Sequence, residues 1–236
     1  MAPPELLRRR QAADQALVTL AIRDLTSIWR TLDLADPDGA TSQLLPVVRD
    51  LTDAYGAATA VVAADFYEDA RAAAGVPGIY RARPAPGPPT EQVDAATRFA
   101  LTPLWSRDPR YGDALRQLAG DTGRLIRAVG HDTVTRSADG DPRATGWQRI
   151  TAPGACKFCV GLASRGGVYK RATVRFASHT NCKCSTSPTW DPDAREVAVE
   201  AYQASARTSR MSPEARRAHR ENTRAWLNRD FPDHPG

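Results

Sequence analysis

All four cysteines of this chain lie in one short stretch, from Cys156 to Cys184, although the sequence has 236 residues. With one histidine they form a C-x-x-C followed by an H-x-x-C-x-C: Cys156 and Cys159, then His179, Cys182 and Cys184. Cysteines grouped at such spacings are typical of thiols that must meet in space. The chain must therefore fold back between the two groups, and Gly166–Gly167 suits the turn that this requires.

These spacings favour a structural zinc knuckle. Tetrahedral Zn²⁺ takes four Cys or His ligands in structural sites. The stretch offers five such side chains, so we expect four of the five at most to bind the ion. The smallest set contains Cys156, Cys159 and Cys182, with either Cys184 or His179 as the fourth ligand. The remaining side chain would be spare or would support the ligands through a hydrogen bond.

Other roles for the cysteines stay open. They could brace a small β-rich module as reduced thiols without metal, or they could form disulfides, which require an oxidising compartment. A thioredoxin-type redox pair is disfavoured because no βαβ pattern surrounds the C-x-x-C. A catalytic zinc is disfavoured as well, because it needs an acid or base nearby and no acidic residue lies between Asp141 and Asp191.

The same region is strongly basic. Between Asp141 and Trp190 there are eight Lys or Arg residues and one acid, a net charge of +7, while the whole chain carries +5. Such a charge suits contact with the phosphate backbone of nucleic acid, without sequence specificity. The side chains that we expect to make this contact are Lys157, Arg165, Lys170, Arg171, Arg175 and Lys183.

The N-terminal part of the sequence indicates long helices. Apolar residues that recur at three and four predict helices over residues 4–33 and 42–74, joined as an antiparallel hairpin. We expect Arg8–Arg10 on a solvated face of the first helix. The second helix is expected to begin at Ser42, with Ser42 or Thr41 as its N-cap.

The pattern as a whole predicts an α+β fold that is mainly α. We divide the chain into five parts: an N-terminal helical hairpin at 1–75, a proline-rich connector at 76–90, a helical segment at 91–140, the Cys/His module at 141–190, and C-terminal helices or a tail at 191–236. Within the third part, Trp105 is expected in the core, because an indole is costly to leave exposed.

The module itself is expected to hold short strands at 147–151, 167–169 and 173–176. Pro188 is expected to close it. Beyond the module we expect helices over residues 192–208 and from Ser212 to about Arg229.

The sequence also argues against several classes of protein. No apolar run approaches 18 residues, which disfavours a membrane span. The N-terminus has no apolar segment after its arginines, which disfavours a secretory signal and favours a reducing cytoplasm. No nucleotide-binding or hydrolase motif is present, so we expect neither an enzyme nor a small-molecule substrate. Ser164 and Ser178 lie near His179 in sequence, which we attribute to chance.

The motifs of the module stand in a definite order: Trp147 and Arg149 in a strand, the C-x-x-C, an L-A-S-R-G turn from Leu162 to Gly166, Val168 and Tyr169, the H-x-x-C-x-C, and Pro188. From Asp141 to Pro188 this order resembles the Mu F-like minor head proteins of tailed bacteriophages, in particular those of phages that infect actinobacteria. The helical N-terminal region is similar to that family in layout only.

The resemblance implies a virion component. Such a protein would be located in the capsid interior near the portal, and in the host cytoplasm during assembly. Its partners would be the portal protein, the major capsid protein and packaged DNA, and it would assist head assembly, DNA packaging or ejection. The alternatives are a zinc-knuckle nucleic-acid-binding protein and, less favoured, a head maturation protease or toxin, although we recognise neither a protease nor a toxin domain in this sequence.

Overall fold

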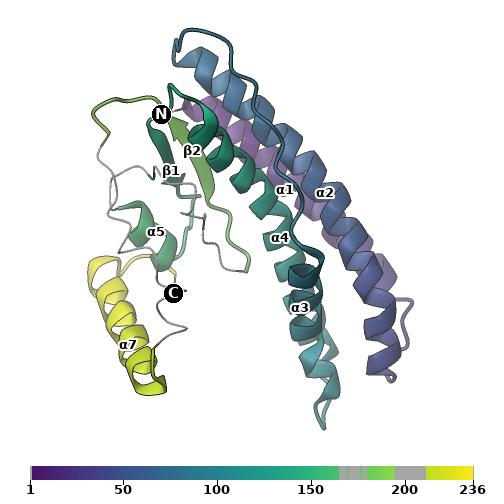
Figure 1. Cartoon of the computed structure of the whole chain (residues 1–236). Helices are drawn as coiled ribbons and strands as arrows, with labels where there is room; N and C mark the ends of the chain where they lie inside the picture. Colours follow the sequence, from purple (N-terminus) through teal and green to yellow (C-terminus); the bar gives the residue numbers. More distant parts are fainter. Residues whose placement is uncertain (1, 165–168, 170–175, 177–179, 195–210, 236) are drawn as a thin grey trace.

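The computed structural model describes residues 2–164, 169, 176, 180–194 and 211–235. These residues form an α+β fold that is mainly α, as predicted, with one two-stranded antiparallel sheet (Figure 1). In chain order the elements are α1 (Pro4–Trp29), α2 (Pro37–Ala73), α3 (Thr90–Leu101), the 3-10 helix η1 (Thr102–Trp105), α4 (Tyr111–Gly140), β1 (Gly146–Ile150), α5 (Lys157–Ala163), β2 (Ser185–Thr189) and α7 (Pro213–Asp230). None of these helices combines the length and the apolar composition that a bilayer span requires.

Helices α1, α2 and α4 lie side by side as a bundle (Figure 1). The start of α1 meets the end of α2, where Arg9 pairs with Asp69. Farther along, Tyr55 of α2 donates its hydroxyl to Asp24 of α1 at 2.5 Å. The two helices therefore run antiparallel, as the hairpin prediction requires.

The second helix begins earlier than predicted. Ser42 is not at its start, because Asp36 caps the helix by accepting a hydrogen bond from the Gly39 N–H at 3.0 Å. Pro37 then occupies the first helical position, where its missing N–H costs nothing. The sequence DPDG at Asp36–Gly39, which lies between the two predicted helices, is thus the start of α2.

The proline-rich connector after α2 turns back along the bundle (Figure 1). Its Ala82 N–H donates to Glu68 Oε1 at 3.1 Å, and its Ala85 N–H donates to Thr133 Oγ1 at 2.9 Å. The connector therefore runs antiparallel to α2, and α3 continues in the same direction, with its Asp94 paired to Arg49 of α2. After η1 the chain reverses, so α4 runs parallel to α2. α4 also packs against α1, which runs antiparallel to it.

The bundle is closely packed because small residues face one another. A Cβ added at Gly123 of α4 would lie 2.9 Å from Val18 Cγ1 of α1. One added at Gly130 of α4 would lie 2.7 Å from Thr59 Cγ2 of α2. Real Cβ atoms do not approach so closely, so these glycines set the separation of the three helices.

Trp105 does not pack in the core as predicted; its exposed fraction is 49%. Its neighbour Leu104 takes the buried position, with an exposed fraction of 2%. Adjacent residues in a 3-10 helix are separated by about 120° around the axis, so the two side chains of η1 cannot share one face. The short turn therefore buries the leucine and leaves the indole at the surface, near the exposed Phe99 of α3.

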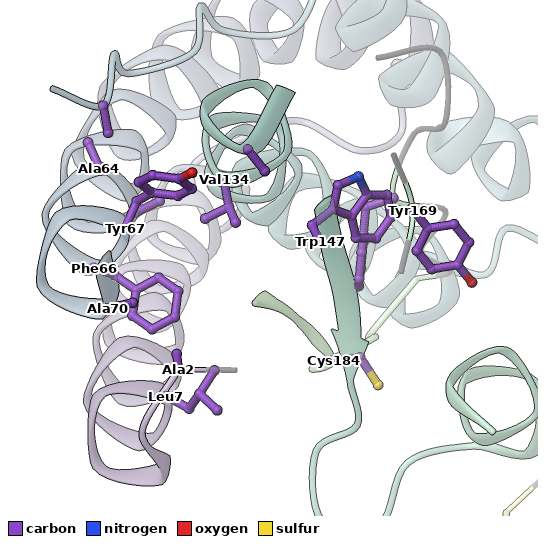
Figure 2. Packing of buried hydrophobic residues seen from close by; sticks show 14 of the residues in the cluster. Ala2, Leu7, Ala64, Phe66, Tyr67, Ala70, Val134, Trp147, Tyr169 and Cys184 are labelled. Carbon is purple, nitrogen blue, oxygen red and sulfur yellow. The ribbon is translucent and has the colours of Figure 1, made fainter. Parts of the chain in front are cut away.

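The sheet pairs β1 with β2, and its register places Trp147 opposite Pro188. Trp147 directs both its N–H and its carbonyl to Tyr169, at 3.0 and 2.7 Å, and the two rings stack at 4.4 Å (Figure 2). Because these backbone groups point away from β2, no donor is needed opposite them and a proline fits there. Pro188 lies inside a strand, so the prediction that it closes the module is wrong.

Three of the predicted segments lie mostly outside the described residues. Of the strands expected at 167–169 and 173–176, only Tyr169 and Phe176 are described, and both are buried in the module. The helix expected over 192–208 lies outside the described residues from 195 onward.

Candidate metal centre

Three thiols meet in the interior of the Cys/His module. Cys159 comes from α5, while Cys182 and Cys184 come from the segment that leads into β2. Their Sγ atoms all lie within 4.8 Å of one another, and those of Cys159 and Cys182 are 3.4 Å apart. All three side chains are buried, and none of the four cysteines of the chain forms a disulfide.

The two other predicted ligands differ in position. Cys156 lies at the N-cap of α5, is half-buried and is not part of the close group of three thiols. His179 lies outside the described residues. The structure therefore brings three of the five predicted side chains together, and the identity of a fourth ligand stays a prediction.

The three thiols are close enough to hold a metal ion. Tetrahedral Zn²⁺ binds thiolate sulfur at about 2.3 Å, which places two ligand sulfurs about 3.8 Å apart. All three sulfurs here lie within 4.8 Å of one another, so the set fits zinc with small adjustments. Hydrogen bonds with the neighbouring thiols of Cys182 and Cys184, together with burial, raise the pKa of Cys159. A cation that binds here must therefore displace protons from the thiols.

A buried arginine lies next to this group. Arg149 of β1 donates from Nη1 to Cys159 Sγ at 3.8 Å, and its guanidinium carbon lies 3.7 Å from the centre of the Phe176 ring. Only 5% of Arg149 is exposed. The sequence marked Arg149 only as part of a strand motif. Nothing in that motif indicates that its guanidinium faces the thiols.

A second buried arginine joins the bundle to the module. Arg10 of α1 donates from Nη1 to the Thr186 carbonyl of β2 at 2.7 Å, pairs with Asp14 at 3.6 Å and faces Phe66 of α2. The prediction that Arg8–Arg10 forms a solvated face is therefore wrong for Arg10, whose exposed fraction is 2%. Arg10 lies on the face of α1 that meets β2, so helical geometry directs its side chain into the interior.

The Arg10 guanidinium also approaches His131 of α4, with Nη2 3.5 Å from Nδ1. Because a guanidinium can only donate, Nδ1 accepts and the proton of the neutral imidazole lies on Nε2. Burial, followed by the charges of Arg10 and Arg149, lowers the pKa of His131 well below its ordinary value. His131 is thus a neutral, structural histidine.

The carboxylate of Asp141, at the C-cap of α4, links this helix through hydrogen bonds to α2 and to the segment after β2. Its Oδ2 accepts hydrogen bonds from Tyr67 Oη at 3.2 Å and Arg71 Nε at 3.0 Å, both on α2, and from Trp190 Nε1 at 3.1 Å, just after β2. Its Oδ1 accepts from the Arg143 N–H at 3.0 Å. Burial alone would raise the pKa of Asp141, but these donors outweigh it and the pKa is lowered.

The predicted phosphate contacts are only partly described. Lys157 opens α5 and donates from Nζ to Asn228 Oδ1 of α7 at 2.9 Å. Lys183 is exposed and lines a hollow of about 330 Å³ between α1 and the module. The other four cations expected to contact phosphate lie outside the described residues: Arg165, Lys170, Arg171 and Arg175.

Comparison with known proteins places the chain in a family. No curated protein and no solved structure matches it significantly. The family described as VG15 protein matches residues 1–222, which include the helical bundle, the cysteine group and part of α7. The chain therefore belongs to the VG15 family, a family of phage proteins.

Proposed function

We propose that this VG15-family phage protein is a minor head protein, associated with the portal and the capsid interior, that assists head assembly, DNA packaging or ejection. The observation that carries the proposal is the module: a buried cysteine group inside a region of net charge +7, fixed to a rigid helical bundle. The order of motifs from Asp141 to Pro188, which resembles that of Mu F-like minor head proteins, supports the same reading.

We infer that the module is held together by a structural Zn²⁺ ion. Cys159, Cys182 and Cys184 would bind it, with Cys156 or His179 as the fourth ligand. The metal would cross-link α5 to the segment before β2, a role that suits a small region with little regular structure. Its test is metal content together with a free-thiol count, on protein purified without chelator or affinity-column metal. One zinc per chain that is lost in Cys159→Ser is expected; four titratable thiols with no metal would contradict it.

The bundle offers surfaces for head partners. At the end of the bundle near α3, the apolar side chains Phe99, Trp105 and Tyr111 are exposed by 69%, 49% and 40%. Aromatic side chains of this kind are enriched at protein interfaces, where they contribute much of the binding energy. In the proposed function this end contacts the portal or the major capsid protein, while the basic module faces packaged DNA.

We propose no catalytic role. Ser164, one of the two serines near His179 in sequence, donates its hydroxyl to the Gly161 carbonyl at 3.0 Å. A zinc-knuckle nucleic-acid-binding protein outside the head remains the second candidate, and the same cysteine group and charge favour it. The two candidate functions can be distinguished, because a protein of the second kind would bind nucleic acid without being part of a virion.

The experiment that separates these functions is quantitative mass spectrometry of purified phage heads. Heads are separated from tails, and the abundance of this protein is compared with that of the portal protein in the same fraction. Recovery of the protein in DNA-filled heads, together with co-purification of co-expressed portal, is the expected result. A protein found in infected cells but absent from heads would overturn the head function and favour the second candidate.

A further inference from the structure

A hollow of about 540 Å³ lies between α5 and α7. Lys157 and Phe158 line it on the α5 side, and Arg220 and Arg224 line it on the α7 side. Among the described residues no acidic side chain lines it. We call this hollow the α5–α7 groove; it combines positive charge with the apolar surface of Phe158 and Leu227.

Two of these cations are available to a ligand. Arg220 and Arg224 are exposed, and within the described part of the chain neither guanidinium takes part in an ion pair. In contrast, Arg229 of the same helix pairs with Asp230, and Arg216 donates to the Met211 carbonyl at 3.1 Å. Residues four apart on a helix lie one above the other, so Arg220 and Arg224 form a short basic edge along one side of the groove.

The two walls of the groove are fixed to each other. A Cβ added at Gly161 of α5 would lie 2.8 Å from side-chain atoms of both Trp226 and Leu227, so α7 is seated directly on this glycine. The chain after α7 returns to the start of α5, where the Lys157 N–H donates to the Pro235 carbonyl at 2.8 Å. Figure 1 shows α7 next to α5 and apart from the bundle of α1, α2 and α4.

We propose that the α5–α7 groove binds single-stranded nucleic acid, with phosphates on Arg220, Arg224 and Lys157 and an unstacked base against Phe158. Sites for single strands combine a basic track with an aromatic side chain on which a base stacks. Phe158 is 39% exposed at this position. The hollow has the size of a small-ligand site and cannot enclose a duplex, whose bases are stacked and turned inward.

This inference goes beyond the contact with packaged DNA in the proposed function, because the groove suits a single strand and not a duplex. It gives a binding role to α7, which the sequence predicted only as a C-terminal helix. Lys157 was predicted to contact phosphate, and the structure places it beside a basic edge that lies more than 60 residues away in sequence.

The test is fluorescence anisotropy of a labelled oligothymidylate of about 12 nucleotides with the full-length protein, titrated at several salt concentrations. We expect the double variant Arg220→Ala/Arg224→Ala to bind about tenfold more weakly. Each lost phosphate contact should also lower the salt slope by about 0.7, so two should lower it by about 1.4. The matched control, Arg98→Ala/Arg107→Ala, removes the same charge from exposed positions in α3 and just after η1, which do not line the groove, and should bind like the wild type.

Phe158 gives a second, independent readout. Phe158→Ala should weaken binding of the oligothymidylate about tenfold, whereas Phe158→Tyr should retain it, because only the ring is needed for stacking. Circular dichroism of each variant establishes that the fold is kept. Equal binding of a duplex of the same length with no effect of Phe158→Ala would overturn the proposal, and so would an equal loss in the two double variants or no binding by the wild type at low salt.

The failure of this inference can be told apart from the failure of the proposed function. Arg220→Ala/Arg224→Ala protein that is incorporated into heads, together with a wild type that does not bind the oligonucleotide, would overturn the groove alone. Tight oligonucleotide binding by a protein absent from heads would overturn the head function alone.

Discussion

Arg149 donates a hydrogen bond to Cys159 Sγ over 3.8 Å, with both side chains buried beneath the surface of the module. A buried guanidinium is costly unless an anion lies nearby. A thiolate bound to a metal ion retains negative charge and can accept such a hydrogen bond. The pairing therefore favours the metal-bound form of the cysteine group and gives the arginine a reason to be buried.

We predict that Arg149→Gln lowers zinc affinity by about tenfold to a hundredfold, the range typical when a hydrogen bond to a metal ligand is removed. Gln is neutral and shorter, so it cannot reproduce the charged hydrogen bond. Competition with a chromophoric chelator measures the affinity. Arg143→Gln makes the same chemical change at an exposed position nearby and should bind zinc like the wild type. Unchanged affinity in Arg149→Gln would show that Arg149 supports the aromatic packing alone.

The second prediction concerns Asp141, which accepts four hydrogen bonds. An amide in its place cannot accept on both sides: its NH₂ group must face either the three donors at Oδ2 or the Arg143 N–H. We expect Asp141→Asn to lower the free energy of unfolding by about 3 kcal/mol, as when one partner of a buried ion pair is removed. Urea denaturation measures it, and the exposed Asp139→Asn is the matched control.

The lowered pKa of Asp141 also fixes the direction of its pH dependence. The stability that the Asp141 carboxylate contributes is fully present above about pH 4, the ordinary pKa of an aspartate. This stability is lost as the pH falls through the lowered pKa of the folded protein. Asp141→Asn should therefore lose less stability than the wild type on acidification below pH 4. Parallel pH profiles of the two proteins would contradict this assignment.

The helices were the most predictable part of this protein. In α2, apolar residues such as Leu44 and Val48 recur on one face, and a local period is enough to predict a helix. β2 carried no such signal, because Ser185–Thr189 reads STSPT and contains a proline. It forms a strand because β1 pairs with it. Trp147, which lies opposite Pro188, needs no N–H donor from that position.

The buried polar contacts could not be predicted in the same way. Arg10 and His131 are 121 residues apart in sequence, and neither lies in a pattern that marks it as buried. Their contact depends on how α1 and α4 pack, which the periodicity of either helix leaves undetermined. The cysteine group was predictable because its spacing is local, and Arg149 beside it was not, because its role depends on which way a strand faces.

The third prediction is a pH dependence centred on His131. Its lowered pKa means that the unfolded chain takes up a proton near pH 6.5 that the folded protein does not. The free energy of unfolding should therefore fall as the pH drops below about 6.5, by up to about 1.4 kcal/mol per pH unit. The raised pKa of Asp14, caused mainly by burial, acts in the opposite direction, so variants must be compared at each pH.

His131→Gln isolates this effect, because its side-chain oxygen can still accept from Arg10 and does not titrate. We expect urea denaturation between pH 7 and pH 5 to give a steeper loss of stability for the wild type than for His131→Gln. His219→Gln, at a partly exposed position on α7, should follow the wild type. Equal slopes for the wild type and His131→Gln would mean that the imidazole is protonated in the folded protein.

The last prediction tests the close packing of α2 and α4. Gly130→Ala gains helix propensity, but the new methyl group would lie 2.7 Å from Thr59 Cγ2, and the branched threonine cannot rotate it away without disturbing its hydrogen bond to the Tyr55 carbonyl. We expect a net loss of about 1–3 kcal/mol, the usual cost of overpacking. Thr59→Ser removes Cγ2 and keeps the hydroxyl, so the double variant Gly130→Ala/Thr59→Ser should recover most of that loss. Additive effects in this double-mutant cycle would show that the loss does not come from the contact with Thr59 Cγ2, and this contact would not set the distance between the two helices.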